Sequence, residues 1–159
     1  MNEIARLGLD REQARPWLTE VVDTVAARLS TPFALITVLL DRAQAFAAGH
    51  GPIPGWLAEA GGTPIEWAFC TTLLRSGSVC GIPDLTADPN HRDNPLVTVA
   101  GVRAYLGAPL VSPHGHALGG LCALDLRPRR FTAEQTVFLQ QMATEAVRRI
   151  ESHAEPAGA

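Results

Sequence analysis

The sequence contains no lysine, because all 13 basic residues among its 159 are arginine. Chemistry that needs an amine nucleophile, such as Schiff-base formation, is therefore excluded, and so is a P-loop, whose lysine contacts nucleotide phosphates. The formal net charge is −3, whereas binding to a phosphate backbone depends on clustered cations. We therefore expect no nucleic-acid partner.

Long apolar runs are also missing. No segment approaches the roughly 18 to 20 apolar residues that a membrane-spanning helix needs, and the first ten residues lack the apolar region of a signal peptide. The sequence therefore predicts a cytoplasmic protein that does not contact a membrane.

Cysteine is scarce, with only Cys70, Cys80 and Cys122. Three is an odd number and too few for a disulfide scaffold, so we expect reduced thiols. No Cys-x-x-Cys spacing occurs, and His114 and His116 lie in a predicted turn without a carboxylate beside them. We therefore expect no metal site.

The composition is that of one folded domain. Hydrophobic residues make up 47% of the chain and charged residues 18%, which argues against disorder, and a chain of this length suits a single core. The predicted organisation is a flexible N-terminus over residues 1–9, a single domain over 10–152 and a disordered tail over 153–159.

Amphipathic helices are predicted near both ends of the chain. Apolar residues repeat at helical spacing between Asp10 and Leu29, and again from Leu139 to Ile150, in a helix that begins at a capping box formed by Thr132 and Gln135. Between them the pattern predicts a short helix over 65–75 and strands over 33–40, 43–48, 78–82, 102–111 and 117–126. Residues 49–64 and 84–99 are rich in turn-forming residues and are predicted to be irregular.

Two hairpins separated by irregular chain do not build a doubly wound parallel sheet. The pattern instead predicts an α+β fold, in which both helices cover one face of an antiparallel sheet. The irregular middle of the chain would cover the other face, over residues 65–76 and 84–99. A sheet face covered in this way is a natural small-molecule pocket.

Five short blocks give the chain a family resemblance. They are Trp67 to Cys70, Ile82 to Pro89, Asp93 to Val97, Val102 to Leu110 and Leu118 to Asp125. In this order and spacing they resemble the GAF domain family over about residues 15–151. The resemblance implies a six-stranded antiparallel sheet with the terminal helices on one face and a ligand pocket on the other. It does not imply a particular ligand, because related folds host different functions.

Two specialised GAF types are a poor match. Those that bind cyclic nucleotides carry an Asn-Lys pair and a Phe with Asp-Glu four residues on, whereas here Phe131 is followed by Gln135 and Thr136 and no lysine exists. Those that bind bilins use a Cys followed by His, whereas Thr71, Gly81 and Ala123 follow the three cysteines. We therefore expect neither cyclic GMP nor a covalent bilin as a ligand. The sequence does not identify a cofactor.

A third GAF type is an enzyme. The free methionine-R-sulfoxide reductases are similar in length and use pocket cysteines, but their reactive cysteine lies in a loop corresponding to residues 84–99, where this chain has none. We therefore assign no catalytic residue. A thiol-based redox sensor or enzyme stays open as an alternative, and so does a degenerate interaction module with a filled pocket.

Eight residues form the candidate ligand-binding set. Arg103 and Tyr105 alternate onto one strand face and suit an anionic or planar ligand, although Arg103 could instead pair with Asp84 or Asp88. Aromatic residues, buried cysteines and turn aspartates also have ordinary structural roles. The set is Trp67, Phe69, Cys70, Asp84, Asn94, Arg103, Tyr105 and Cys122.

The sequence thus favours a non-catalytic sensory module. It would bind a small molecule or transmit a signal, and it would form a homodimer through its terminal helices, where Trp17 and Phe138 offer aromatic ridges for a partner.

Overall fold

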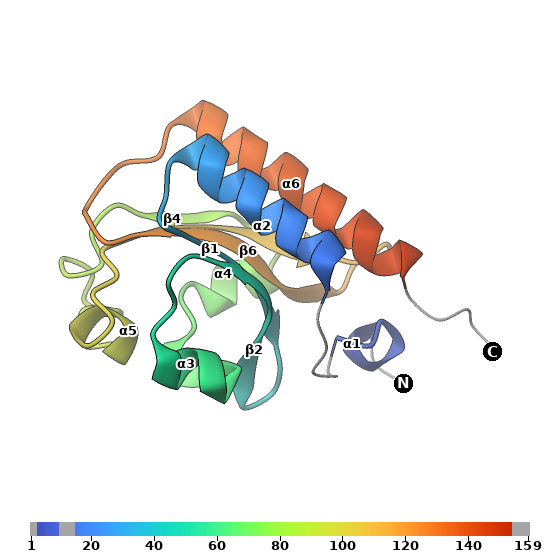
Figure 1. Ribbon diagram of the computed structural model, residues 1–159, viewed down its shortest axis with the longest axis horizontal. Coiled ribbons are helices and arrows are strands. Elements are labelled where there is room, and N and C mark those ends of the chain that lie inside the picture. The colour runs from blue at the N-terminus through green and yellow to red at the C-terminus, as the bar shows by residue number, and fades with distance from the viewer. Residues whose placement is uncertain (1–2, 10–14, 154–159) are drawn as a thin grey trace.

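A six-stranded antiparallel sheet forms the centre of the molecule (Figure 1). The computed structural model describes residues 3–9 and 15–153. The strand order is β3-β2-β1-β6-β5-β4, and the strands are β1 (Phe33–Leu39), β2 (Ala43–His50), β3 (Gly62–Pro64), β4 (Cys80–Ile82), β5 (Ala104–Val111) and β6 (Ala117–Asp125). The α+β fold expected from the sequence is confirmed.

The two central strands, β1 and β6, are buried on both faces. Their register places Leu35 opposite Cys122 and Ile36 opposite Leu121. Because successive side chains point to opposite faces, the first pair faces one hydrophobic cluster and the second pair faces the other. The sheet therefore separates two apolar layers.

Two long helices cover one face of the sheet, and they lie side by side in Figure 1. They are α2 (Pro16–Leu29) and α6 (Ala133–Ser152). The predicted capping box of α6 is confirmed, since Gln135 N–H donates to Thr132 Oγ1 at 3.1 Å and Thr132 N–H donates to Gln135 Oε1 at 2.9 Å. Both helices bury the predicted stripes, with α2 contributing Leu18, Val21, Val22, Val25, Ala26 and Leu29.

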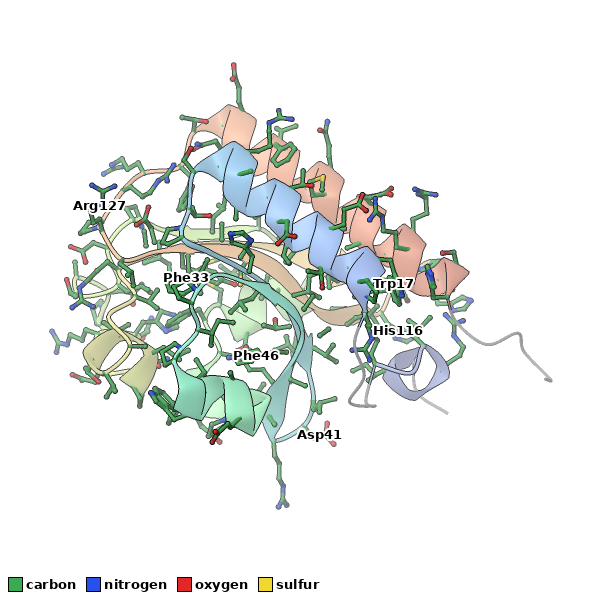
Figure 2. The ribbon with its side chains drawn as sticks, in the orientation of Figure 1. Trp17, Phe33, Asp41, Phe46, His116 and Arg127 are labelled. Atoms are coloured by element: carbon green, nitrogen blue, oxygen red, sulfur yellow. A yellow bond between two sulfur atoms is a disulfide. The ribbon has the colours of Figure 1, made fainter. Side chains whose placement is uncertain are left out.

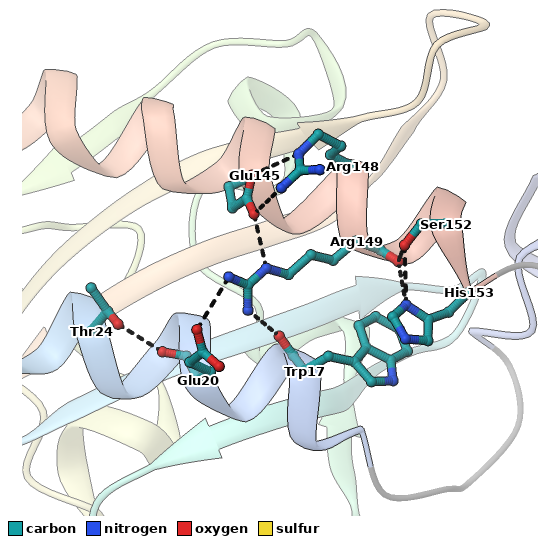
Figure 3. A network of polar contacts seen from close by, with 8 residues as sticks. All are labelled: Trp17, Glu20, Thr24, Glu145, Arg148, Arg149, Ser152 and His153. Atoms are coloured by element: carbon teal, nitrogen blue, oxygen red, sulfur yellow. Dashed lines mark hydrogen bonds and ion pairs between the residues drawn. The ribbon is translucent and has the colours of Figure 1, made fainter.

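A polar network joins α2 to α6 (Figure 3). The guanidinium of Arg149 in α6 donates to the backbone oxygen of Trp17 in α2 at 2.8 Å, to Glu145 at 2.9 Å and to Glu20 at 3.3 Å. The ring of His153 stacks on the Trp17 indole with centroids 4.0 Å apart. These contacts fix how the two helices lie against each other.

Short helices lie over the opposite face: α3 (Gly55–Ala60), the single 3₁₀ turn η1 (Ile65–Trp67), α4 (Thr71–Arg75) and α5 (Pro95–Thr98). Residues 49–64 were expected to be irregular but contain α3 and β3. The pairing of β3 with β2 requires Gly62, because a Cβ there would lie 2.2 Å from the backbone oxygen of Gln44. This close approach depends on tertiary structure and leaves no periodic signal.

The first residues also carry structure, although the sequence predicted a flexible N-terminus. Helix α1 (Glu3–Arg6) is followed by Leu7 and Leu9, which are buried in the helix-side cluster, and Arg6 pairs with Glu151 at 2.7 Å. Residues 10–14, where the first long helix was expected to begin, and residues 154–159 of the predicted tail lie outside the described part. Within the described ranges, no helix has the length and apolar character needed to cross a bilayer.

Candidate functional site

A cavity of about 260 Å³ lies on the sheet face opposite α2 and α6. Its floor comes from β1, β2, β5 and β6, and its cover comes from three separate segments around α3, α4 and α5. The lining residues are Phe33, Leu35, Thr37, Leu39, Gln44, Phe46, Pro52, Ile53, Pro54, Leu57, Phe69, Leu74, Leu96, Ala100, Val102, Tyr105, Cys122, Leu124 and Leu126. The expected pocket therefore has a physical counterpart in the structure.

Strand alternation positions the floor. On β1, every second residue from Phe33 to Leu39 faces the cavity. Across the sheet, Cys122 of β6 lies opposite Leu35, and Phe46 of β2 lies between the sheet and α3 in Figure 2. The floor is therefore built from regular structure, which holds its side chains in fixed positions.

The cavity wall is mainly apolar and carries no charged side chain among the described lining residues. Two of its polar side chains already have partners. Gln44 Nε2 donates to Thr63 Oγ1 at 2.7 Å, and Thr37 Oγ1 donates to the backbone oxygen of Gly120 at 3.4 Å. The wall thus favours burial of apolar ligand surface.

Tyr105 and Cys122 supply the other polar groups of the wall, and both are buried. Burial raises the pKa of Tyr105 well above its ordinary value, and the nearby Cys122 raises it further. Burial also raises the pKa of the Cys122 thiol to about 12, although a hydrogen bond from the Leu35 backbone opposes this. Both groups therefore stay protonated and neutral near pH 7.

Gly107 makes room for the Tyr105 hydroxyl. A Cβ at Gly107 would lie 2.1 Å from Tyr105 Oη, so no other residue fits without displacing the ring. Gly107 belongs to the Val102 to Leu110 block of the family resemblance but not to the candidate ligand-binding set. The available signal was a glycine within a strand, which often marks a close approach by another group.

Cys70 and Cys80 form a disulfide, so the expectation of reduced thiols is wrong for this pair. Cys70 immediately precedes α4, and Cys80 begins β4 at the edge of the sheet. The fold brings their Cα atoms to 6.2 Å, within the usual range for a disulfide. The pair could not be predicted from the number of cysteines, because it depends on how α4 packs on the sheet. Cys122 is a free, buried thiol.

Of the eight candidate ligand residues, Phe69, Tyr105 and Cys122 line the cavity. Phe69 comes from the cover and meets Tyr105 edge to face, with ring centroids 5.2 Å apart. Residues outside the candidate set also line the cavity, above all Phe33, Phe46 and Leu57. Their signal was the apolar run that begins the first hairpin and the apolar Trp56-Leu57 segment.

Cys70, Trp67 and Asn94 lie in the covering segments but are not among the residues that line the cavity. Cys70 is in the disulfide, and Trp67 packs edge to face against Trp56 with centroids 6.3 Å apart. Asn94 accepts the N–H of Leu96 at the start of α5 and donates from Nδ2 to the backbone oxygen of Trp67 at 3.0 Å. Asn94 therefore joins two covering segments.

Arg103 and Asp84 also hold the backbone rather than line the cavity. The Arg103 guanidinium donates to the backbone oxygens of Val97 at 2.9 Å and Val102 at 3.1 Å. Asp84 accepts hydrogen bonds from the side chain of Thr86 at 2.6 Å and from its backbone at 3.0 Å. The side-chain bond is the main cause of the lowered pKa of Asp84, and Arg103 makes a smaller contribution.

The GAF domain family model matches residues 16–150. A cyclic di-GMP phosphodiesterase of Pseudomonas aeruginosa is 35% identical over 135 residues, which are 84% of this chain and 22% of that protein. The chain therefore spans about a fifth of the length of this relative.

Solved structures share the fold at low sequence identity. The type II free methionine-R-sulfoxide reductase of Thermoplasma acidophilum superposes with a TM-score of 0.70 at 11% identity, covering 88% of this chain and 94% of that one. The free methionine-R-sulfoxide reductase of Neisseria meningitidis gives 0.69 at 16%, covering 96% and 92%. The PixJ GAF domain of Thermosynechococcus elongatus gives 0.64 at 15%, covering 84% and 82%. At these identities the likeness concerns the fold alone.

Proposed function

The chain belongs to the GAF domain family, and we propose that it is a sensory module that binds a small molecule in the cavity between the sheet and α3, α4 and α5. The observation that carries the proposal is the cavity itself, about 260 Å³ in volume and lined by 19 residues from both the sheet and its cover. Concave, mainly apolar sites with a few polar groups are typical of small-molecule binding. A degenerate module with a filled pocket would lack this space.

The sheet offers a route from the cavity to the helices. Leu35 and Cys122 line the cavity, while their neighbours Ile36 and Leu121 lie in the helix-side cluster. A ligand that moves β1 or β6 would therefore also move the floor on which α2 and α6 pack. The proposed signal is a change in the packing of these helices between two states of different ligand affinity.

We further propose that the protein works in the cytoplasm as a homodimer joined through α2 and α6. Val137 of α6 is 50% exposed, and the guanidinium of Arg28 in α2 lies 4.5 Å from the ring centroid of the adjacent Phe138. Light scattering at high micromolar concentration tests the dimer, with Val137→Glu expected to give a monomer. A monomeric wild-type protein would contradict this part of the proposal.

An inventory of small molecules that co-purify with the native protein tests the binding function. The control is Ala100→Phe, because Ala100 lines the cavity after α5 and is half-buried, so a phenyl ring there occupies ligand space. We expect mass spectrometry to find a molecule enriched with the wild-type protein and depleted with Ala100→Phe. Equal recovery from both proteins would place binding elsewhere.

A thiol-based redox function is the second candidate, and the Cys70–Cys80 disulfide is the observation that favours it. Cys70 follows Phe69, a residue of the cavity wall. The reaction would be the reduction of methionine sulfoxide. Two thiols lose their protons and form the S–S bond, the sulfoxide oxygen leaves as water, and the sulfoxide becomes a thioether. A thioredoxin-type dithiol would then reduce the disulfide.

Turnover of free methionine sulfoxide with a thioredoxin-type reductant separates the two candidates. The sensory proposal predicts no turnover by the wild-type protein above that of Cys70→Ser. Turnover that disappears in Cys70→Ser would favour the enzyme. The matched control is Ser76→Ala, an exposed position shortly after α4.

A further inference from the structure

We propose that the cavity selects an uncharged, mainly aromatic molecule of one or two rings, whose polar group meets the hydroxyl of Tyr105. This inference rests on the proposed function and specifies its ligand. The strand face of Arg103 and Tyr105 was expected to suit an anionic or planar ligand, and this inference keeps the planar ligand and drops the anionic one.

The described part of the cavity wall carries no charge. None of the described lining residues is acidic, basic or a histidine. The expected cation, Arg103, is turned to the backbone oxygens of Val97 and Val102 instead. A carboxylate or phosphate in the cavity would lose its hydration without gaining a cationic partner, and this strongly disfavours binding.

The size of the cavity and the aromatic side chains in its wall suit a flat ligand. A dry cavity of about 150 Å³ lined by aliphatic and aromatic side chains is large enough for benzene, and this cavity is about 260 Å³. Phe33, Phe46, Phe69 and Tyr105 contribute rings to its wall. A flat one- or two-ring molecule therefore matches both the volume and the stacking surfaces.

The Tyr105 hydroxyl provides the polar anchor. Tyr105 lines the cavity with only 4% of its surface exposed, and its hydroxyl lies over Gly107 in the same strand. Thr37 and Gln44 are engaged with neighbouring groups. A hydroxyl in an apolar cavity wall is a favourable donor, so a ligand with an acceptor placed here would gain one hydrogen bond that fixes its orientation.

Three naphthalene derivatives of similar shape test the inference at pH 7. They are naphthalene, which has no polar group, 2-naphthol, which is neutral, and 2-naphthoate, which is anionic. We expect 2-naphthol to bind most tightly by fluorescence titration and 2-naphthoate at least tenfold more weakly. Tyr105→Phe should weaken 2-naphthol binding about 2- to 10-fold, the range for one neutral hydrogen bond, and leave naphthalene binding unchanged. The control Val99→Ala, at a 70% exposed position, should alter none of the three.

The outcomes distinguish the ligand class from the binding function. If 2-naphthoate binds as tightly as 2-naphthol, the neutral-ligand inference is wrong while the sensory proposal stands. An unchanged 2-naphthol affinity in Tyr105→Phe would show that the Tyr105 hydroxyl does not bind the polar group of the ligand. If none of the probes binds and no molecule co-purifies, both proposals fail. Thermal denaturation checks the fold of each variant, and the order of the three probes on the wild-type protein tests the inference even if Tyr105→Phe does not fold.

Discussion

The ring of Phe69 meets the ring of Tyr105 at an angle of 64° with centroids 5.2 Å apart. Phe69 belongs to the segment before α4, whereas Tyr105 belongs to β5. The ring of His91 packs against Phe69 at the same centroid distance. This aromatic contact joins the cavity cover to the sheet, so the shape of the cavity depends on it.

Phe69→Ala should lower the free energy of unfolding by about 3 kcal/mol, because removing a buried phenyl group costs burial energy and leaves a void. Phe69 is 6% exposed. Urea denaturation measures the change. Val99→Ala is the control, and an exposed substitution of this kind should stay within about 0.5 kcal/mol. A Phe69→Ala effect no larger than that of Val99→Ala would show that the aromatic contact does not support the cover.

The thiols should respond to denaturation and reduction in a defined order. In the folded protein Cys122 is buried and Cys70 and Cys80 are paired, so we expect no rapid reaction with a disulfide reagent such as dithiobisnitrobenzoate. Denaturation without reductant should release one thiol, and reduction followed by denaturation should release three. Three thiols from the denatured protein before reduction would contradict the disulfide.

The stability of the protein should fall as the pH rises above 9. The pKa of Cys122 is raised to about 12 in the folded state, so the unfolded chain loses this proton at lower pH than the folded chain does. The stabilisation is complete below the unfolded pKa and is lost as the pH rises towards 12. Urea denaturation from pH 8 to 11 should therefore show a steeper loss for the wild-type protein than for Cys122→Ala. The same pH dependence of the unfolding free energy in both proteins would mean that the Cys122 thiol does not contribute to it.

Arg149→Met should destabilise the packing of α2 against α6 by about 1 kcal/mol, since Arg149 donates a charged hydrogen bond to the Trp17 backbone. The expected destabilisation is small because one quarter of the Arg149 side chain is exposed to solvent, which screens its ion pairs. Arg148→Met is the matched control, because Arg148 also pairs with Glu145 but does not reach α2. Urea denaturation should show a smaller loss of unfolding free energy for Arg148→Met than for Arg149→Met. Equal losses would mean that the contact of Arg149 with α2 does not stabilise the packing of the two helices.

Periodicity predicted the layers of the fold because each depends on local pattern. The apolar stripes of α2 and α6 and the short apolar run of β1 could be seen along the chain. In contrast, β3 depends on the approach of Gly62 to Gln44, and the disulfide depends on the packing of α4 near β4. Such contacts join segments whose separation in space the sequence pattern does not define.

The candidate site could be predicted only in part for the same reason. Tyr105 and Cys122 lie on strands that the sequence pattern predicted, and alternation determines which face of the sheet each side chain occupies. Arg103 precedes β5, and its side chain turns to the Val97 backbone at the end of α5. The residue pattern does not define where α5 lies over the sheet. It therefore could not predict that the Val97 carbonyl lies within reach of Arg103.

The account rests on an open apolar cavity, and a crystal structure of the protein pressurised with xenon tests it most directly. Xenon enters dry apolar cavities and is located by its anomalous scattering. We expect xenon between the β1 and β6 floor and the cover, near Phe46 and Leu124, and its absence from the same place in Ala100→Phe. A wild-type crystal without xenon there, with side chains occupying the space, would contradict the account and favour an interaction module with a filled pocket.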